Sequence, residues 1–164
     1  MSGFSAEELA AIDDAEVVDA VLGVVWGSVA GLEEAEVAGI LEAAPEGFGV
    51  VHTVYLLDAE IQNGGFHQYF WNTQQLYVPI LKRSLASLGA TEHLGLLEEA
   101  LRILEQEPVV RSGDRSEDML RAFSRSAVGS PLSPLDDKWY ALPPVKELLV
   151  AYVRRHPGLF WEKE

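Results

Sequence analysis

Apolar residues recur at helical spacing along most of the chain. The clearest run is Leu94, Leu97, Leu101 and Leu104, whose members are three or four positions apart and therefore lie on one face of a helix. Helical signals dominate elsewhere too, and the sequence contains no repeat, low-complexity tract or linker long enough to separate domains. The pattern predicts an all-α fold, built as a single compact multi-helix domain over residues 1–164.

Two acidic helices are predicted before Pro45. Ser5 and Glu8 fit a capping box, so a helix begins here and runs, with or without an interruption, towards Ala30. A second helix covers residues 33–44 and ends near Pro45, because proline is not tolerated inside a helix. In the first of these helices Gly23, Gly27 and Gly31 recur every four residues. This stripe of small residues predicts close packing against another helix.

The middle of the chain is predicted to contain a central helix followed by a turn. Residues 48–61 are apolar on nearly every side, which is typical of a helix buried in the core. Asn63 and Gly64 supply the left-handed conformations that end many helices. We therefore expect at least one residue of the turn 63–65 to have a positive φ, with a short helix over 66–71 after it.

The second half of the chain is also predicted to be helical. Pro79 falls in the first turn of a helix that ends at Gly89. Residues 129–136 contain two prolines and are predicted to form a loop, and the aromatic pair Phe160 and Trp161 is expected to pack on the core. The remaining helices are expected over residues 91–107 (with Thr91 as N-cap), over 116–126, and from Pro143 or Pro144 to His156.

Composition narrows the environment of the protein. The sequence has no cysteine, which excludes disulfides and thiolate metal sites and suits a cytoplasmic protein. The first residues lack the basic and apolar segments of a signal peptide. The longest apolar run, residues 21–32, is shorter than the roughly 20 residues of a membrane span. We expect a cytoplasmic protein that does not enter a membrane.

Charge is distributed unevenly along the chain. The net charge is −14, and residues 1–81 contain 13 Asp and Glu but no Lys or Arg. This argues against nucleic acid as a direct ligand, because contacts to phosphates need basic side chains. It favours a basic protein as partner. High net charge also keeps proteins soluble, so an acidic helical protein with no binding role remains an alternative.

An enzyme is the second alternative, because one polar cluster lies in the middle of an apolar region. Glu60, Asn63, His67 and Gln68 would line a polar pocket, and His67 would meet Glu60 across the turn as an acid/base pair. No histidine lies at the spacing of helical zinc or di-iron sites. We therefore expect no metal, no cofactor and no catalytic residue, and regard the turn as structural.

Three blocks in the sequence resemble one known family. The stretch "EIQNGGFHQYFWN" (60–72), the later "LDDKWYAL" (135–142) and "LVAYVRRHPGLFW" (149–161) are similar to the family of DNA-mimic protein nineteen, over about residues 48–161. The N-terminal 45 residues match no motif of the family. The resemblance implies an all-helical domain that presents acidic groups, in place of DNA phosphates, to a DNA-binding protein. Residues that look like the signature of this fold are Asn63, Gly64, Gly65, Phe66, Gln68 and Phe70.

A DNA mimic needs a high density of acids outside this neutral turn. Residues 7–19 contain six acids over about 20 Å of helix, whereas duplex DNA offers roughly 11 charges over that length. A mimic must therefore combine several helices or two copies of the chain, which leaves a homodimer open. We expect the partner-binding surface to consist of Glu7, Glu8, Asp13, Asp14, Asp19, Glu33, Glu34, Glu36 and Glu42.

Overall fold

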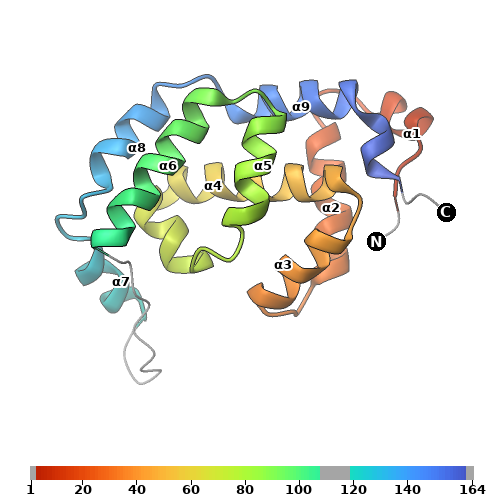
Figure 1. The fold of residues 1–164 in the computed structure, drawn as a ribbon. Helices are drawn as coiled ribbons and strands as arrows, with labels where there is room; N and C mark the ends of the chain where they lie inside the picture. The colour runs from red at the N-terminus through yellow and green to blue at the C-terminus, as the bar shows by residue number, and fades with distance from the viewer. Residues whose placement is uncertain (1–2, 108–118, 162–164) are drawn as a thin grey trace. The chain divides into compact units, whose positions relative to one another are not determined.

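The computed structural model describes residues 3–107 and 119–161, and this part of the chain is helical with no β-strand (Figure 1). The prediction of an all-α fold is confirmed. The elements are α1 (Ala6–Ala11), α2 (Val17–Val29), α3 (Glu34–Ala43), α4 (Glu46–Thr73), α5 (Val78–Ser87), α6 (Thr91–Gln106), α7 (Met119–Ala127), α8 (Ser133–Tyr140), α9 (Val145–Arg155) and the 3-10 helix η1 (Pro157–Phe160).

The chain groups into two compact units. Unit 1 comprises residues 1–56, 76–90 and 143–164, and unit 2 comprises residues 57–75 and 91–142. Helix α4 contributes its first part to unit 1 and its second part to unit 2. The single domain expected from the sequence remains a prediction.

In unit 1, helix α2 packs against α9, and α1 contacts α9 and η1. The capping box predicted for Ser5 and Glu8 starts α1, and the interruption left open by the sequence falls between α1 and α2. The core-facing side of α2 is formed by fully buried residues: Val17, Val18, Val21, Leu22 and Val25. The close packing predicted for the glycine stripe is wrong. A Cβ built on Gly23, Gly27 or Gly31 would meet no atom within 4 Å, because the glycines face away from the valine-rich side.

The first part of α4 forms the centre of unit 1. Phe48, Val51 and Val54 are completely buried, as expected for a helix without a polar face. The Phe160 ring meets Phe48 edge-on, with 5.6 Å between the ring centroids. Phe160 is fully buried as predicted, but the expectation for Trp161 is wrong, since this side chain is 52% exposed. The 3-10 helix ends at Phe160, and Trp161 continues in an extended conformation beyond it.

In unit 2, α6 packs against α8, and both contribute buried apolar residues, among them Leu97, Leu104 and Leu135. The structure corrects the loop predicted over residues 129–136, because α8 already begins at Ser133. The loop was predicted because Pro134 was interpreted as a residue that ends a helix. A proline in the first turn of a helix does not interrupt it, because the amide there has no partner within the helix. Thr91, predicted as an N-cap, is the first residue of α6.

A break at two glycines divides α4. Gly64 is non-helical, with a φ of −161° and a ψ of 23°, and Gly65 has a φ of 77°. The predicted positive φ is thus found at Gly65, and not at Asn63 or Gly64. After the break, Phe66, Tyr69 and Phe70 are buried together, as the pattern of residues 66–71 predicts.

Among the helices of the described ranges, none combines the length and the apolar character that a membrane span requires.

Candidate functional site

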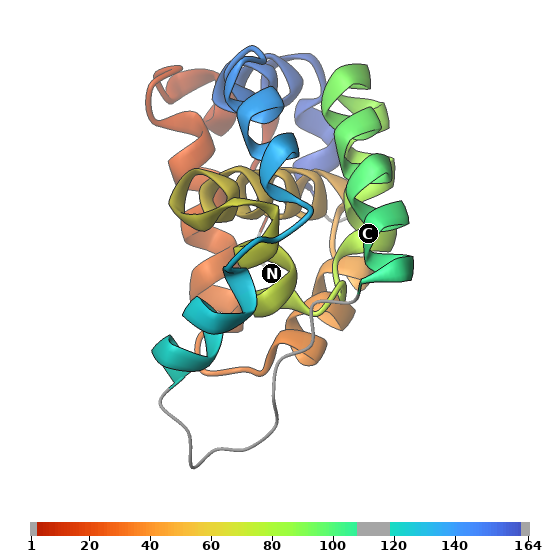
Figure 2. The same ribbon diagram turned by 90° about the vertical axis from the view of Figure 1, so that its left-hand side faces the viewer.

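The acids of unit 1 form the first candidate site. All nine acids named from the sequence are exposed, and we call them the acidic surface. They form two groups. The first group lies on α1 and around the start of α2, and its members are Glu7, Glu8, Asp13, Asp14 and Asp19. The second group lies on α3 and at the residue before it, and its members are Glu33, Glu34, Glu36 and Glu42. Figures 1 and 2 show α1 and α3 at opposite ends of α2. Since α2 has 13 residues, about 20 Å of helix separates the two groups.

Glu8 in the first group is held by the start of its own helix. Its carboxylate accepts the backbone N–H of Ser5 at 2.8 Å, and the Glu8 N–H donates to the Ser5 hydroxyl at 3.2 Å. These hydrogen bonds from Ser5 lower the pKa of Glu8. Glu8 therefore keeps its charge at neutral pH and helps to fix the direction of α1.

Helix α9 supplies cations to two acids of the first group. Arg154 Nε donates to Asp14 Oδ1 at 2.7 Å, and Lys146 Nζ lies 3.5 Å from Asp19 Oδ2. The Arg154 guanidinium also donates to the backbone carbonyls of Leu9 and Ile12 at the end of α1. Arg154 therefore fixes the acidic helix α1 to α9, and both of these pairs reduce the negative charge that the first group presents to a partner.

Most acids of the second group have structural partners. The carboxylate of Glu36 accepts the N–H of Glu33 at 3.0 Å in a capping box that starts α3. The Tyr77 hydroxyl donates to Glu34. One guanidinium nitrogen of Arg83, Nη2, donates to both carboxylate oxygens of Glu42, at 2.9 and 3.0 Å. Only this last interaction cancels charge, so three negative charges remain at the beginning of α3.

The second candidate site is the break in α4 within unit 2. Oδ1 of Asp136, on α8, accepts the N–H of Phe66 at 2.8 Å, and so satisfies the first amide after the break. Burial raises the pKa of Asp136, while the hydrogen bond from Phe66 acts in the opposite direction. Because the helix is broken at Gly64 and Gly65, the Asp136 carboxylate takes the place of the backbone carbonyl that would accept the Phe66 N–H in a continuous helix.

Glu60 does not pair with His67 as the enzyme alternative expected. The Glu60 Oε2 atom instead accepts hydrogen bonds from Gln68 at 2.7 Å and from Asn72 at 2.8 Å, which fastens the two parts of α4 to each other. His67 Nε2 lies 2.9 Å from the Ser126 hydroxyl, and burial lowers the pKa of His67. The proposed acid/base pair is therefore replaced by two separate hydrogen-bonding groups.

The end of α8 is bound to α4 by two further hydrogen bonds. Trp139 Nε1 donates to Asp58 Oδ1 at 2.9 Å, and the Tyr140 hydroxyl donates to the Ile61 carbonyl at 2.8 Å. Asp58 and Asp136 were not singled out in the sequence. The sequence did contain a signal for these contacts, since two of the three blocks that resemble the family are joined by them. Asp136 and Tyr140 of "LDDKWYAL" bond to Phe66 and Ile61 of "EIQNGGFHQYFWN".

Neither candidate site has the features of a metal centre. In residues 3–107 and 119–161, no group of three or more His, Asp and Glu side chains is arranged to hold a metal ion. The carboxylates of Asp58, Glu60 and Asp136 each accept a hydrogen bond from another residue of unit 2.

A family model matches the part of the chain that contains the hydrogen-bonded blocks 60–72 and 135–142 of unit 2. The model of the family described as DMP19-like protein matches residues 42–156. The chain belongs to this family. Searches of curated proteins and of solved structures found no match. Both hydrogen-bonded blocks, 60–72 and 135–142, lie within the residues that match the family.

The acidic surface lies almost entirely outside that match. Of its nine acids, only Glu42 falls within residues 42–156. Arg83, Lys146 and Arg154, which pair with Glu42, Asp19 and Asp14, all fall inside it. The DMP19-like part of the chain thus supplies the cations that bind the N-terminal acidic helices.

Proposed function

We propose that this protein is a non-enzymatic, cytoplasmic binding protein whose acidic surface engages a basic or DNA-binding protein in place of DNA. The description of the DMP19-like family supports the choice of partner, since the family takes its name from DNA mimicry. The observation that carries the proposal is the placement of two exposed acidic groups at opposite ends of α2. A partner with basic side chains at a similar separation would contact both groups at once.

The acids contribute unequally to this surface. The side chains of Glu7 and Asp13 are exposed and form no hydrogen bond or ion pair with any other described residue. Asp14, Asp19 and Glu42 are paired with cations of unit 1, so a partner would have to replace an existing interaction. Exposed ion pairs contribute only about 0–1 kcal/mol each. Binding therefore needs many of the acids together, and it should weaken as salt rises.

The mimicry itself is tested by competition with DNA. A protein captured by this chain at low salt is identified, and its complex with a fluorescent DNA duplex is titrated with the chain. The proposal expects the chain to displace the DNA, because the same basic surface of the partner binds either one. Simultaneous binding of DNA and chain would contradict it.

One substitution separates the proposal from the enzyme alternative. His67 is buried between aromatic rings of unit 2, whereas all nine acids of the acidic surface belong to unit 1. His67→Ala should leave displacement of the DNA unchanged once the protein is folded. A variant that folds but no longer competes would contradict the assignment of binding to the acidic surface.

A further inference from the structure

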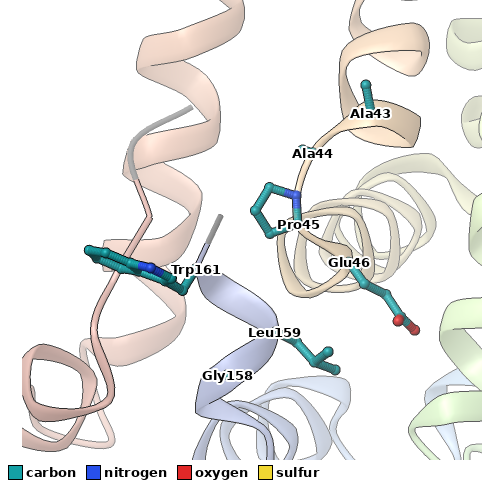
Figure 3. Close-up of a pocket in the computed structure, with 7 residues that line it drawn as sticks. All are labelled: Ala43, Ala44, Pro45, Glu46, Gly158, Leu159 and Trp161. Carbon is teal, nitrogen blue, oxygen red and sulfur yellow. The ribbon is translucent and has the colours of Figure 1, made fainter. Parts of the chain in front are cut away.

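A cleft in unit 1 lies between the end of α3, the start of α4 and the 3-10 helix η1. Its volume is about 380 Å³. In Figure 3, Trp161 stands at one side of the cleft and Glu46 at the other, with Pro45 and Leu159 between them. None of the sequence motifs includes Pro45 or Glu46, and neither candidate site described above uses the cleft.

Close packing fixes the walls of this cleft. A Cβ on Gly47 would lie 2.6 Å from the Phe160 ring and 2.8 Å from the Leu159 carbonyl oxygen, so η1 rests directly on the first turn of α4. The N–H of Phe4 donates to the Phe160 carbonyl at 2.8 Å and holds η1 from the other side. The cleft is therefore a preformed depression, which reduces the entropy cost of binding.

The lining of the cleft is apolar except at one end. Ala43, Ala44, Pro45 and Leu159 contribute hydrocarbon, and the half-exposed Trp161 adds an indole ring. Glu46 is the one charged residue of the lining, and it has no ion-pair partner among the described residues. The charge of Glu46 also acts on Tyr152 of unit 1. Burial chiefly, and the Glu46 carboxylate in addition, raise the pKa of Tyr152 to about 12.

Backbone dipoles do not change the sign of the charge in the cleft. The carboxyl end of α3 and the amino end of α4 meet here, and their partial charges, each about half a unit and of opposite sign, largely cancel. Among the described residues, the full charge of Glu46 therefore makes the cleft favour cations over anions.

We propose that this cleft binds an arginine side chain of the basic partner. The proposal rests on the proposed function, which supplies a partner with basic side chains. An arginine has an apolar stem that would lie on Pro45 and Leu159 and a guanidinium that would reach Glu46. At the opposite side of the cleft the apolar stem would also pack against the Trp161 indole. An apolar side chain would cover Glu46 without neutralising its charge, and an acidic one would be repelled by it.

The test uses the whole chain and a small probe, so it does not depend on finding the partner. N-acetylarginine methylamide is titrated into the protein while the indole N–H signals are followed by nuclear magnetic resonance, with the Trp161 signal assigned from Trp161→Phe. The corresponding citrulline derivative has the same shape without the charge. We expect saturable shifts at Trp161, and threefold to fivefold weaker binding of citrulline, the range expected for about 1 kcal/mol from an exposed ion pair.

Two pairs of variants provide matched controls. Glu46→Gln should weaken arginine binding by about the same threefold to fivefold, whereas Glu105→Gln, which removes an equal charge at an exposed site outside both the cleft and the acidic surface, should have no effect. Trp161→Leu should also weaken binding. Trp26→Leu should not, although Trp26 is similarly exposed at 48%.

Equal binding of citrulline and arginine, equal loss with Glu105→Gln and Glu46→Gln, or the absence of a saturable shift at Trp161 would each overturn the proposal. None of these results would change the competition with DNA that tests the acidic surface. Conversely, a chain that fails to compete with DNA can still bind the arginine probe, so failure of one proposal is distinguishable from failure of the other.

Discussion

A methyl group at Gly65 would lie 2.3 Å from Oδ2 of Asp136, the residue whose other carboxylate oxygen accepts the N–H of Phe66. The backbone of Gly65 adds a second constraint. Its φ of 77° and ψ of −179° belong to a region that is nearly exclusive to glycine. Space and backbone conformation thus demand glycine at the same position, which explains physically why the turn contains Gly65.

We expect Gly65→Ala to lower the free energy of unfolding by at least about 2 kcal/mol, from backbone strain and overlap with the carboxylate. Urea denaturation measures the loss. Gly89→Ala is the matched control, since Gly89 also has a positive φ of 67° but has no atom within 4 Å of the added Cβ. Its cost should be about 1 kcal/mol. Equal costs at the two positions would contradict a role for Asp136.

A double-mutant cycle isolates that overlap. In the Asp136→Ala background the added methyl group no longer meets a carboxylate, so Gly65→Ala should cost at least about 1 kcal/mol less than in the wild type. The same chemical denaturation series provides this value. Additive effects would show that backbone strain alone accounts for Gly65.

Stability of unit 1 should fall in mild acid because of His52. Burial lowers the pKa of His52 from 6.5 to about 4, and neither ring nitrogen has a hydrogen-bond partner among the described residues. Since the pKa is lower in the folded state, protons favour unfolding. The contribution of His52 is complete above about pH 6.5 and is lost as the pH falls towards 4. Between pH 7.5 and 5 the loss should be about 2 kcal/mol.

His52→Leu should remove this dependence, because leucine fills a similar volume and does not titrate. His156→Gln is the control, since His156 is exposed. Unfolding by urea at the two pH values provides the comparison. A wild type and a His52→Leu variant that lose equal stability on acidification would contradict the prediction.

Removal of Arg154 should loosen α1 selectively. Its guanidinium donates to the carbonyls of Leu9 and Ile12 and to the carboxylate of Asp14, so Arg154→Ala removes a donor from each of the three, at a cost of about 1–3 kcal/mol. Amide hydrogen exchange in α1 should accelerate more than in α6. Arg155→Ala is the control, because among the described residues the Arg155 side chain bonds only to Ala151 of its own helix. Unchanged exchange in α1 would show that other contacts hold it.

Local patterns in the sequence predicted the fold well where a helix is specified by its own residues. The capping box at Ser5, the apolar helix after Pro45 and Pro79 in the first turn of α5 depend on residues within a few positions of one another. The start of α8 was missed because Pro134 was interpreted as a breaker, and proline is compatible with both a loop and a first helical turn.

Interactions between distant residues could not be predicted. The hydrogen bond from Phe66 to Asp136 joins residues 70 positions apart, and nothing in either segment alone identifies the partner. The cations that pair with Asp14 and Asp19 come from α9, more than 120 residues later. The sequence therefore predicted which acids are exposed, but not which of them are already paired.

These pairings change how the acidic surface is best tested. Two acids of the acidic surface, Glu7 and Asp13, and the exposed Glu16 that precedes α2 have no side-chain partner among the described residues. Glu7→Gln, Asp13→Asn and Glu16→Gln can therefore be combined without breaking an ion pair. The matched control, on α6 of unit 2 and the residue that follows it, removes the same total charge from three exposed residues, Glu92, Glu105 and Glu107, by substitution with glutamine.

The most direct measurement is the rate constant of association between the chain and its captured partner, at low and at high salt, for the wild type and these two triple variants. The proposed acidic surface predicts slower association for the variant at Glu7, Asp13 and Glu16, with a shallower dependence on salt, because steering depends on the local field. The α6 variant should associate like the wild type. Equal slowing of both variants would show that only total charge matters, and would contradict a specific acidic surface on α1–α3.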